Sequence, residues 1–114
     1  MAESEARDVF HRICSNPDHV VLVAELDGKV VGAATLLIEQ KFIHNGGRAG
    51  HIEDVAVLDD MRGSGIGASL IRVCLDHAVR AGCYKTVLQC TDAVKEFYQN
   101  LGFRHHDSGM RFDH

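Results

Sequence analysis

Three glycines at alternate positions, Gly63, Gly65 and Gly67, constrain the fold more than any other feature of this 114-residue chain. They separate two segments with different patterns of apolar residues. Residues 51–58, HIEDVAVL, have the composition of a strand. The segment after the glycines repeats at helical spacing, and one apolar face contains Ile66, Leu70, Ile71, Cys74, Leu75 and Ala78. A strand, a glycine loop and an amphipathic helix in succession predict a helix packed on a sheet, and therefore an α/β layer fold.

The remaining segments predict elements that complete such a fold. β-branched residues flank Asp27-Gly28, a pair typical of a tight hairpin turn, so two strands are expected over residues 19–40. The full expected order is a helix over 4–16, this hairpin, a loop over 43–50, a strand over 51–58, the helix after the glycines, a strand over 84–90, a short helix through Asn100 and an extended segment from Phe103. This order describes a mixed sheet with helices packed on it.

Length and composition bound the class of protein. We expect a single domain, residues 1–114, because 46% hydrophobic and 25% charged residues are globular averages. The net charge of −4 gives no electrostatic reason to expect a nucleic-acid partner. No apolar run is long enough to span a membrane and the N-terminus lacks the layout of a signal peptide, so a cytoplasmic protein is expected. No CxxC pair occurs, and we expect packed, reduced thiols at Cys14, Cys74, Cys83 and Cys90.

The glycine stretch has two interpretations from its own residues. The first amides of a helix lack partners within the helix and carry partial positive charge, and glycines let a phosphate approach them closely. Arg62 would add a formal positive charge. The spacing GxGxG is neither the GxGxxG dinucleotide fingerprint nor a GxxxxGK[ST] phosphate loop, so a turn that only permits close helix–sheet packing stays open.

Three neighbouring features favour anion binding. Glu53 and Asp54 alternate faces of their strand, so at least one carboxylate should point to the covered face or into a cleft, unless the position faces solvent at an edge. Tyr98, on the short helix, can reach such a cleft or be an ordinary half-buried tyrosine. Basic and aromatic residues gather in KFIH (41–44) and Tyr84-Lys85 near strand ends, where small polar ligands tend to bind.

Together these residues resemble the GNAT superfamily of N-acetyltransferases, because RGSGIG (62–67) is similar to its Q/R-x-x-G-x-G/A loop. Within the superfamily the chain resembles the glucosamine 6-phosphate N-acetyltransferases. The motifs are KFIHNGGRAGHIEDVAV (41–57), RGSGIGASLI (62–71), GCYKTVLQC (82–90) and VKEFYQNLGF (94–103), within roughly residues 20–104. The resemblance implies a mixed, mostly antiparallel central sheet flanked by helices, with a shortened N-terminus.

The resemblance also implies acetyl-CoA as cosubstrate and no metal. The pyrophosphate would lie beside Arg62 on the amides of Gly63, Ser64, Gly65, Ile66, Gly67 and Ala68. A backbone N–H of Val55, Ala56 or Val57 would polarise the thioester carbonyl. Gln99 and Asn100 would contact the CoA arm, and Tyr98 would protonate the departing thiolate as general acid.

The implied acceptor is D-glucosamine 6-phosphate, acetylated to N-acetyl-D-glucosamine 6-phosphate on the route to UDP-N-acetylglucosamine. Its amine would attack the thioester directly, so no cysteine nucleophile is needed, and Cys83 and Cys90 are assigned to packing. The contacts implied for the sugar phosphate are Lys41, Phe42, Ile43, His44, Glu53, Asp54, Val55, Tyr84 and Lys85. A homodimer without nucleic-acid or membrane partners is also implied.

The chain departs from the family pattern at three places. Gln89 stands where an acidic residue is usual, so Asp54, a water chain or the amine's own equilibrium would have to handle the proton. Gly109 stands where an acidic substrate contact is expected. The N-terminus is short, which is consistent with a compact version, a partner subunit that completes the site, or a trimmed chain. His105, His106 and Asp107 are interpreted as a polar turn rather than a metal site.

Two other functions stay open on the sequence. One is a GNAT enzyme that acetylates another amine, such as a polyamine, an antibiotic or a protein amine. The other is a non-catalytic acyl-CoA-binding module. The motifs KFIH (41–44) and GHIEDVAV (50–57) favour the amino-sugar phosphate over another amine. The binding module stays open because of Gln89 and the short N-terminus.

Overall fold

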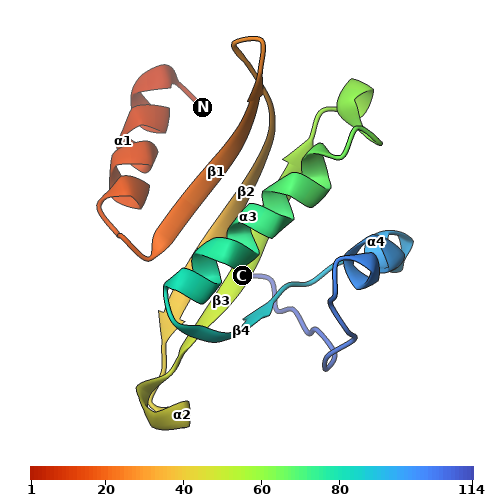
Figure 1. The fold of residues 1–114 in the computed structure, drawn as a ribbon. Coiled ribbons are helices and arrows are strands. Elements are labelled where there is room, and N and C mark those ends of the chain that lie inside the picture. The colour runs from red at the N-terminus through yellow and green to blue at the C-terminus, as the bar shows by residue number, and fades with distance from the viewer.

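Four strands form one mixed sheet in the computed structural model, which describes residues 1–114. The helices and strands are α1 (Glu3–Cys14), β1 (His19–Leu26), β2 (Lys29–Gln40), α2 (Ile43–Gly46), β3 (Arg48–Val57), α3 (Ile66–Arg80), β4 (Cys83–Val87) and α4 (Lys95–Asn100). The strand order is β1-β2-β3-β4, in which β4 alone runs parallel to its neighbour. α3 lies across the sheet, α1 lies beside β1 and α4 lies beyond β4 (Figure 1). The expected α/β class and mostly antiparallel sheet are confirmed.

The β1–β2 hairpin turns at the predicted pair. Asp27 and Gly28 have φ angles of 51° and 77°, both left-handed, and Leu26 pairs directly with Lys29. Left-handed angles at both central residues are typical of the type I′ turn, whose twist matches that of the two strands. The turn thereby sets the register of β2 against β1.

The hydrophobic core lies between α3 and one face of the sheet. Four of the six apolar residues predicted for the helix face are buried, namely Leu70, Ile71, Cys74 and Ala78. They pack against the sheet residues Ala34, Leu36, Ile38 and Ile52. Burying a Leu or Ile side chain stabilises a fold by about 1.5–3 kcal/mol, so this layer supplies most of the stability. No helix in the structure combines the length and the apolar character that crossing a membrane requires.

Gly32 on β2 lets the first turn of α3 approach the sheet closely. A methyl group at Gly32 would lie 3.0 Å from Leu70 Cδ1, 3.2 Å from Ile66 Cγ2 and 3.2 Å from the Ala56 carbonyl oxygen. That oxygen belongs to the β3 backbone and cannot move without moving the strand. The start of α3 is therefore held against the end of β3, on either side of the glycine stretch.

Two strand boundaries differ from those predicted. β3 begins at Arg48 rather than at residue 51, because Gln40 pairs with Arg48 across the short turn of α2. The loop expected over 43–50 therefore shortens to this turn. β4 ends at Val87 rather than at residue 90, because its last partner on β3 is His51. Both differences arise from pairing between strands, which the local sequence does not encode.

The extended segment predicted from Phe103 does not join the sheet. The Phe103 N–H donates to the Tyr98 carbonyl at 3.1 Å, and residues 104–114 make no backbone–backbone hydrogen bond. The outer edge of β4 therefore stays unpaired. The prediction of a last strand is therefore wrong.

The four cysteines are free thiols in different environments. Cys74 is buried in the core, where desolvation raises the pKa of its thiol. Cys83 is half-buried, whereas Cys14 and Cys90 are exposed. The expectation of packed thiols is therefore wrong for Cys14, near the end of the exposed helix α1, and for Cys90, which follows the end of β4.

We expect Gly32→Ala to lower the free energy of unfolding by about 1–3 kcal/mol, the usual cost of overpacking a core. Urea unfolding followed by circular dichroism measures the change. Gly67→Ala is a matched control, because a methyl group there would meet Phe97 at 3.5 Å, an ordinary contact. Equal losses in the two variants would contradict the assignment of the effect to the close approach at Gly32.

Candidate active site

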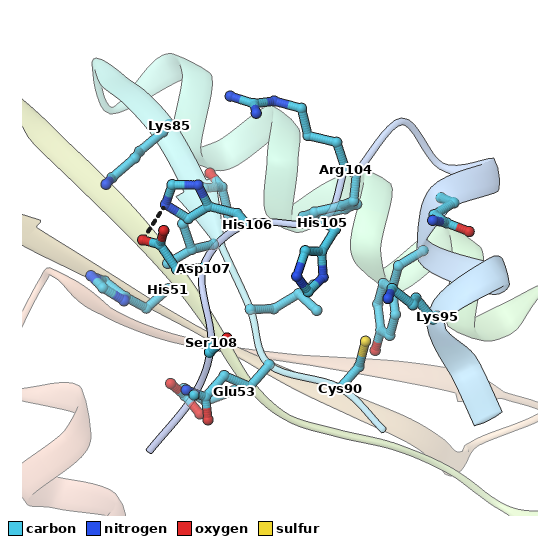
Figure 2. Close-up of a pocket in the computed structure, with 18 of the residues that line it drawn as sticks. His51, Glu53, Lys85, Cys90, Lys95, Arg104, His105, His106, Asp107 and Ser108 are labelled. Atoms are coloured by element: carbon cyan, nitrogen blue, oxygen red, sulfur yellow. Dashed lines mark ion pairs between the residues drawn. The ribbon is translucent and has the colours of Figure 1, made fainter. Parts of the chain in front are cut away.

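A cavity of about 890 Å³ lies beside the parallel pair of strands. It is lined by β3, by β4 and the residues that follow it, by α4 and by residues 103–111. Figure 2 shows labelled side chains from all four of these segments around it. His51 and Glu53 flank the buried Ile52 on β3, so they lie on the sheet face opposite to α3. The cavity and the core therefore use opposite faces of the same strand.

β3 carries a bulge next to the cavity. Ala33 pairs with Ala56 but Thr35 pairs with Glu53, so Asp54 and Val55 together oppose a single residue of β2. Asp54 has a left-handed φ of 52°, which is uncommon for a residue other than glycine. A bulge interrupts the hydrogen-bond ladder and bends the strand. It occurs at the segment Val55, Ala56 and Val57, which the resemblance assigns to the thioester carbonyl.

The two adjacent carboxylates have different positions. Both Glu53 and Asp54 are exposed, and only Glu53 lines the cavity. The expectation that at least one of them points into a cleft is confirmed for Glu53. Asp54, at the bulge, is outside the cavity lining.

Tyr98 lines the cavity from α4 and is half-buried. Its ring makes edge-on contacts with Phe97 and Phe103, at centroid distances of 5.0 and 5.8 Å. Desolvation, and secondarily the nearby Cys90, raise the pKa of its hydroxyl. The phenol is therefore protonated at neutral pH, as a proton donor must be.

The glycine stretch presents free backbone donors. Gly63 and Gly65 have left-handed φ angles of 79° and 87°, and Gly65 is the N-cap of α3. The first helical hydrogen bond is donated by the Ser69 N–H to the Gly65 carbonyl at 3.0 Å. The amides without a backbone acceptor are those of Gly63, Gly65, Ile66, Gly67 and Ala68. Unpaired amides at a helix N-terminus favour an anion.

Two of the residues assigned to the pyrophosphate, Ser64 and Arg62, already interact with neighbouring residues of the loop. The Ser64 N–H donates to the Met61 carbonyl at 3.4 Å, and the Ser64 hydroxyl donates to the same oxygen. Arg62 pairs with Asp59 at 3.2 Å and is exposed. Neither contact is buried, so both groups remain accessible to a ligand.

The loop, the end of β3 and α4 meet around Gly67. A methyl group at Gly67 would lie 3.5 Å from Phe97 and 3.7 Å from Val57. Gln99, two residues after Phe97, lines the cavity, and Asn100 ends α4. The residues that the resemblance assigns to acetyl-CoA therefore belong to three segments in mutual contact.

The predicted sugar-phosphate residues divide into two groups. Glu53 and Lys85 line the cavity. The residues at the α2 end of the sheet do not: Lys41 pairs with Glu39 at 3.3 Å, His44 stacks on Tyr84 at 4.0 Å, and Phe42 and Ile43 are exposed. Lys85 connects the groups, since its ammonium lies 5.6 Å from the centroid of the Tyr84 ring. Within one chain, the predicted set is not a single site.

Several cavity residues were not predicted from the sequence. Their shared feature is a basic side chain, and they are His51, Lys95, Arg104, His105, His106 and Arg111. Four lysines and arginines and three histidines line the cavity against three carboxylates, in a protein of net charge −4. Clustered basic residues in RHH (104–106) were the available signal. No three histidine, cysteine, aspartate or glutamate side chains gather closely enough to hold a metal ion.

The two departures at Gln89 and Gly109 are neighbours in space. Both residues line the cavity, and a methyl group at Gly109 would lie 2.9 Å from the Gln89 Nε2 atom. The Gln89 carboxamide therefore occupies the volume that a side chain at position 109 would need. The two positions at which the chain departs from the family pattern therefore adjoin each other in the cavity wall.

Comparison with known proteins gives consistent results. Residues 2–103 match the acetyltransferase (GNAT) family. Glucosamine 6-phosphate N-acetyltransferase 1 of Oryza sativa subsp. japonica is 44% identical over 106 residues, which cover 90% of this chain and 64% of the rice protein. Glucosamine 6-phosphate N-acetyltransferase of Trypanosoma brucei brucei is 43% identical over 86 residues, covering 75% of this chain and 58% of that protein. The chain thus spans about three fifths of these two curated relatives.

Solved structures agree with the sequence relatives. The crystal structure of glucosamine-6-phosphate N-acetyltransferase from Arabidopsis thaliana superposes with a TM-score of 0.96 at 36% sequence identity. The superposition covers 98% of this chain and 78% of that one. The sheet and its helices therefore correspond to an arrangement known by crystallography.

We expect the Tyr98 phenol to ionise above the ordinary value of about 10, because burial and the nearby Cys90 disfavour the phenolate. The chain has two tyrosines, and a Tyr84→Phe variant leaves Tyr98 as the only one. Its near-ultraviolet absorbance then reports this hydroxyl alone. The same variant unfolded in urea is the reference, and coincident titrations in the two states would contradict the expectation.

Proposed function

The chain belongs to the acetyltransferase (GNAT) family, and we propose that it transfers the acetyl group of acetyl-CoA to the amine of D-glucosamine 6-phosphate. The products are CoA and N-acetyl-D-glucosamine 6-phosphate, a precursor of UDP-N-acetylglucosamine. The observation that carries the proposal is the 44% identity to glucosamine 6-phosphate N-acetyltransferase 1 of Oryza sativa subsp. japonica, over 90% of this chain. Residues 1–114 act in this proposal as a single acetyltransferase domain.

In the proposed complex, the glycine stretch holds the pyrophosphate of acetyl-CoA. Five unpaired amides, from Gly63 to Ala68, support this assignment, together with the exposed Arg62 guanidinium. Gln99 and Asn100 contact the CoA arm from α4. The thioester would then run along the end of β3, which Gly67 approaches closely.

The proposed chemistry is a direct displacement. The unprotonated amine attacks the thioester carbonyl, and a backbone N–H of Val55, Ala56 or Val57 stabilises the oxyanion. The carbon–sulfur bond then breaks, and Tyr98 donates its proton to the thiolate as general acid. Gln89 cannot accept the amine's proton, so Asp54 or water serves. The mechanism uses no metal.

The proposed acceptor site combines cations for the phosphate with carboxylates for the sugar. Glu53 and Lys85 lie in the cavity and support this assignment. Asp54 and Val55 adjoin Glu53 along the strand. Five other assigned residues lie outside the lining of this cavity, namely Lys41, Phe42, Ile43, His44 and Tyr84. In the proposed homodimer, the exposed turn around α2 would contact the cavity of the second copy.

The proposal is tested by following CoA release with a thiol reagent. We expect release from acetyl-CoA when D-glucosamine 6-phosphate is present, and much less with unphosphorylated glucosamine. A panel of polyamines, aminoglycosides and peptides completes the assay. Faster CoA release with any of these acceptors would contradict the assignment of the amino-sugar phosphate as the substrate. Binding of CoA without turnover of any acceptor would indicate an acyl-CoA-binding module.

We expect Tyr98→Phe to lower kcat by about 10²-fold or more, because general acid catalysis commonly contributes that factor. The dissociation constant for CoA should stay within about twofold of the original value, since the ring and its aromatic contacts are retained. Steady-state kinetics and titration calorimetry give the two quantities. Unchanged kcat would exclude Tyr98 as the general acid, and a parallel loss of CoA affinity would indicate a role in binding instead.

A further inference from the structure

Glu39, Lys41 and His51 form a charged triad that joins the end of β2 to β3 at the edge of the cavity. Glu39 Oε1 lies 2.9 Å from His51 Nε2 and 3.3 Å from Lys41 Nζ. Glu39 and His51 are diagonal neighbours on the two paired strands, because Leu37 is the direct partner of His51. They share the face opposite to α3, since Ile38 and Ile52 point into the core. The triad is thus fixed by strand register rather than by a loop.

Glu39 determines which nitrogen of His51 faces a ligand. The hydrogen bond from His51, and then the contact with Lys41, lower the pKa of the Glu39 carboxyl, so it is ionised at neutral pH. An ionised carboxylate only accepts hydrogen bonds, so Nε2 of His51 carries a proton. Nδ1 is left for another partner, and when it is protonated too, the imidazolium can donate to an anion.

His51 lies in the part of the cavity where other basic groups gather. Figure 2 shows His51, Lys85 and His106 at one end of the cavity, and Cys90 and Lys95 at the other. Tyr98 lies on α4 with Lys95 and is influenced by Cys90, so the proposed general acid belongs to the second end. His51 and the proposed general acid therefore lie at opposite ends of the cavity.

We propose that His51 binds the phosphate of the acceptor and that Glu39 is the positioning residue that orients its imidazole. This inference rests on the proposed function, and it assigns the orientation of the sugar phosphate, with the amine toward α4 and the phosphate toward His51 and Lys85. No feature of the local sequence indicated this role.

The charges around His51 make its protonation matter. Facing it are Glu39 and Lys41 from the end of β2, Glu53 from β3, Lys85 from β4, and the His106–Asp107 pair of the C-terminal segment, 3.2 Å apart. The three carboxylates outnumber the two lysines. A phosphate dianion only accepts hydrogen bonds, so the imidazolium form of His51 is the one that can donate to it while Nε2 stays bonded to Glu39.

The first experiment compares two acceptors in His51→Gln. We expect KM for D-glucosamine 6-phosphate to rise about tenfold, with kcat within about twofold, while kinetics with glucosamine are unchanged. Titration calorimetry with both sugars in the presence of CoA repeats the comparison as binding. Turnover of D-glucosamine 6-phosphate by the unaltered protein tests the proposed function. The change in KM caused by His51→Gln, compared between the two sugars, tests this inference. Equal losses with both sugars, or a fall in kcat alone, would overturn the phosphate contact.

The second experiment uses a permanent cation. His51→Arg keeps a hydrogen-bond donor and adds a permanent positive charge, so we expect its KM for D-glucosamine 6-phosphate to lie well below that of His51→Gln. Glu39→Gln, which keeps the size of the side chain, should raise the same KM with kcat within about twofold, because an ionised carboxylate no longer orients the imidazole. Equal KM values in His51→Arg and His51→Gln would overturn the proposal, and melting temperatures verify that each variant is folded.

Discussion

The packing of α3 on β2 and β3 is the contact on which the rest of the structure depends. Leu36, Ile71 and Cys74 have no exposed side-chain surface in this layer. Gly32 lets the first turn of the helix reach the strand backbone. Because the unpaired amides of a helix lie in its first turn, the contact that stabilises the sheet also sets the glycine stretch against the end of β3. The core and the position of the glycine stretch therefore depend on one interaction.

The sheet divides its two faces between stability and chemistry. No polar or charged residue is buried in the core. Glu39 of β2 and His51 and Glu53 of β3 lie on the other face, where water still reaches them. Their interactions are therefore moderate in strength, since screening by solvent weakens exposed ion pairs. Tyr98 differs, because its aromatic neighbours remove water from the ring.

The sequence predicted the features that depend on residues close together in the chain. The turn at Asp27-Gly28 and the buried face of α3 follow from backbone preference and helical spacing, and both are confirmed. The bulge at Asp54 depends on pairing with a strand about twenty residues earlier, and nothing in its own neighbourhood indicates it. The partner of His51 is twelve residues away, so their contact was equally hidden. The resemblance assigned the residues at the α2 end to the sugar phosphate, and did not indicate that they lie outside the cavity of their own chain.

The wall formed by residues 103–111 supplies nine of the 21 residues around the cavity, Phe103 to Arg111. Beyond Phe103 it makes no backbone–backbone hydrogen bond, and its side chains after Phe103 are exposed. Exposed substitutions usually change stability little. Mutations in this wall can therefore alter the shape and charge of the cavity while the sheet, the helix and the glycine stretch persist. Such a division lets the wall of the cavity vary in sequence without a compensating change in the core.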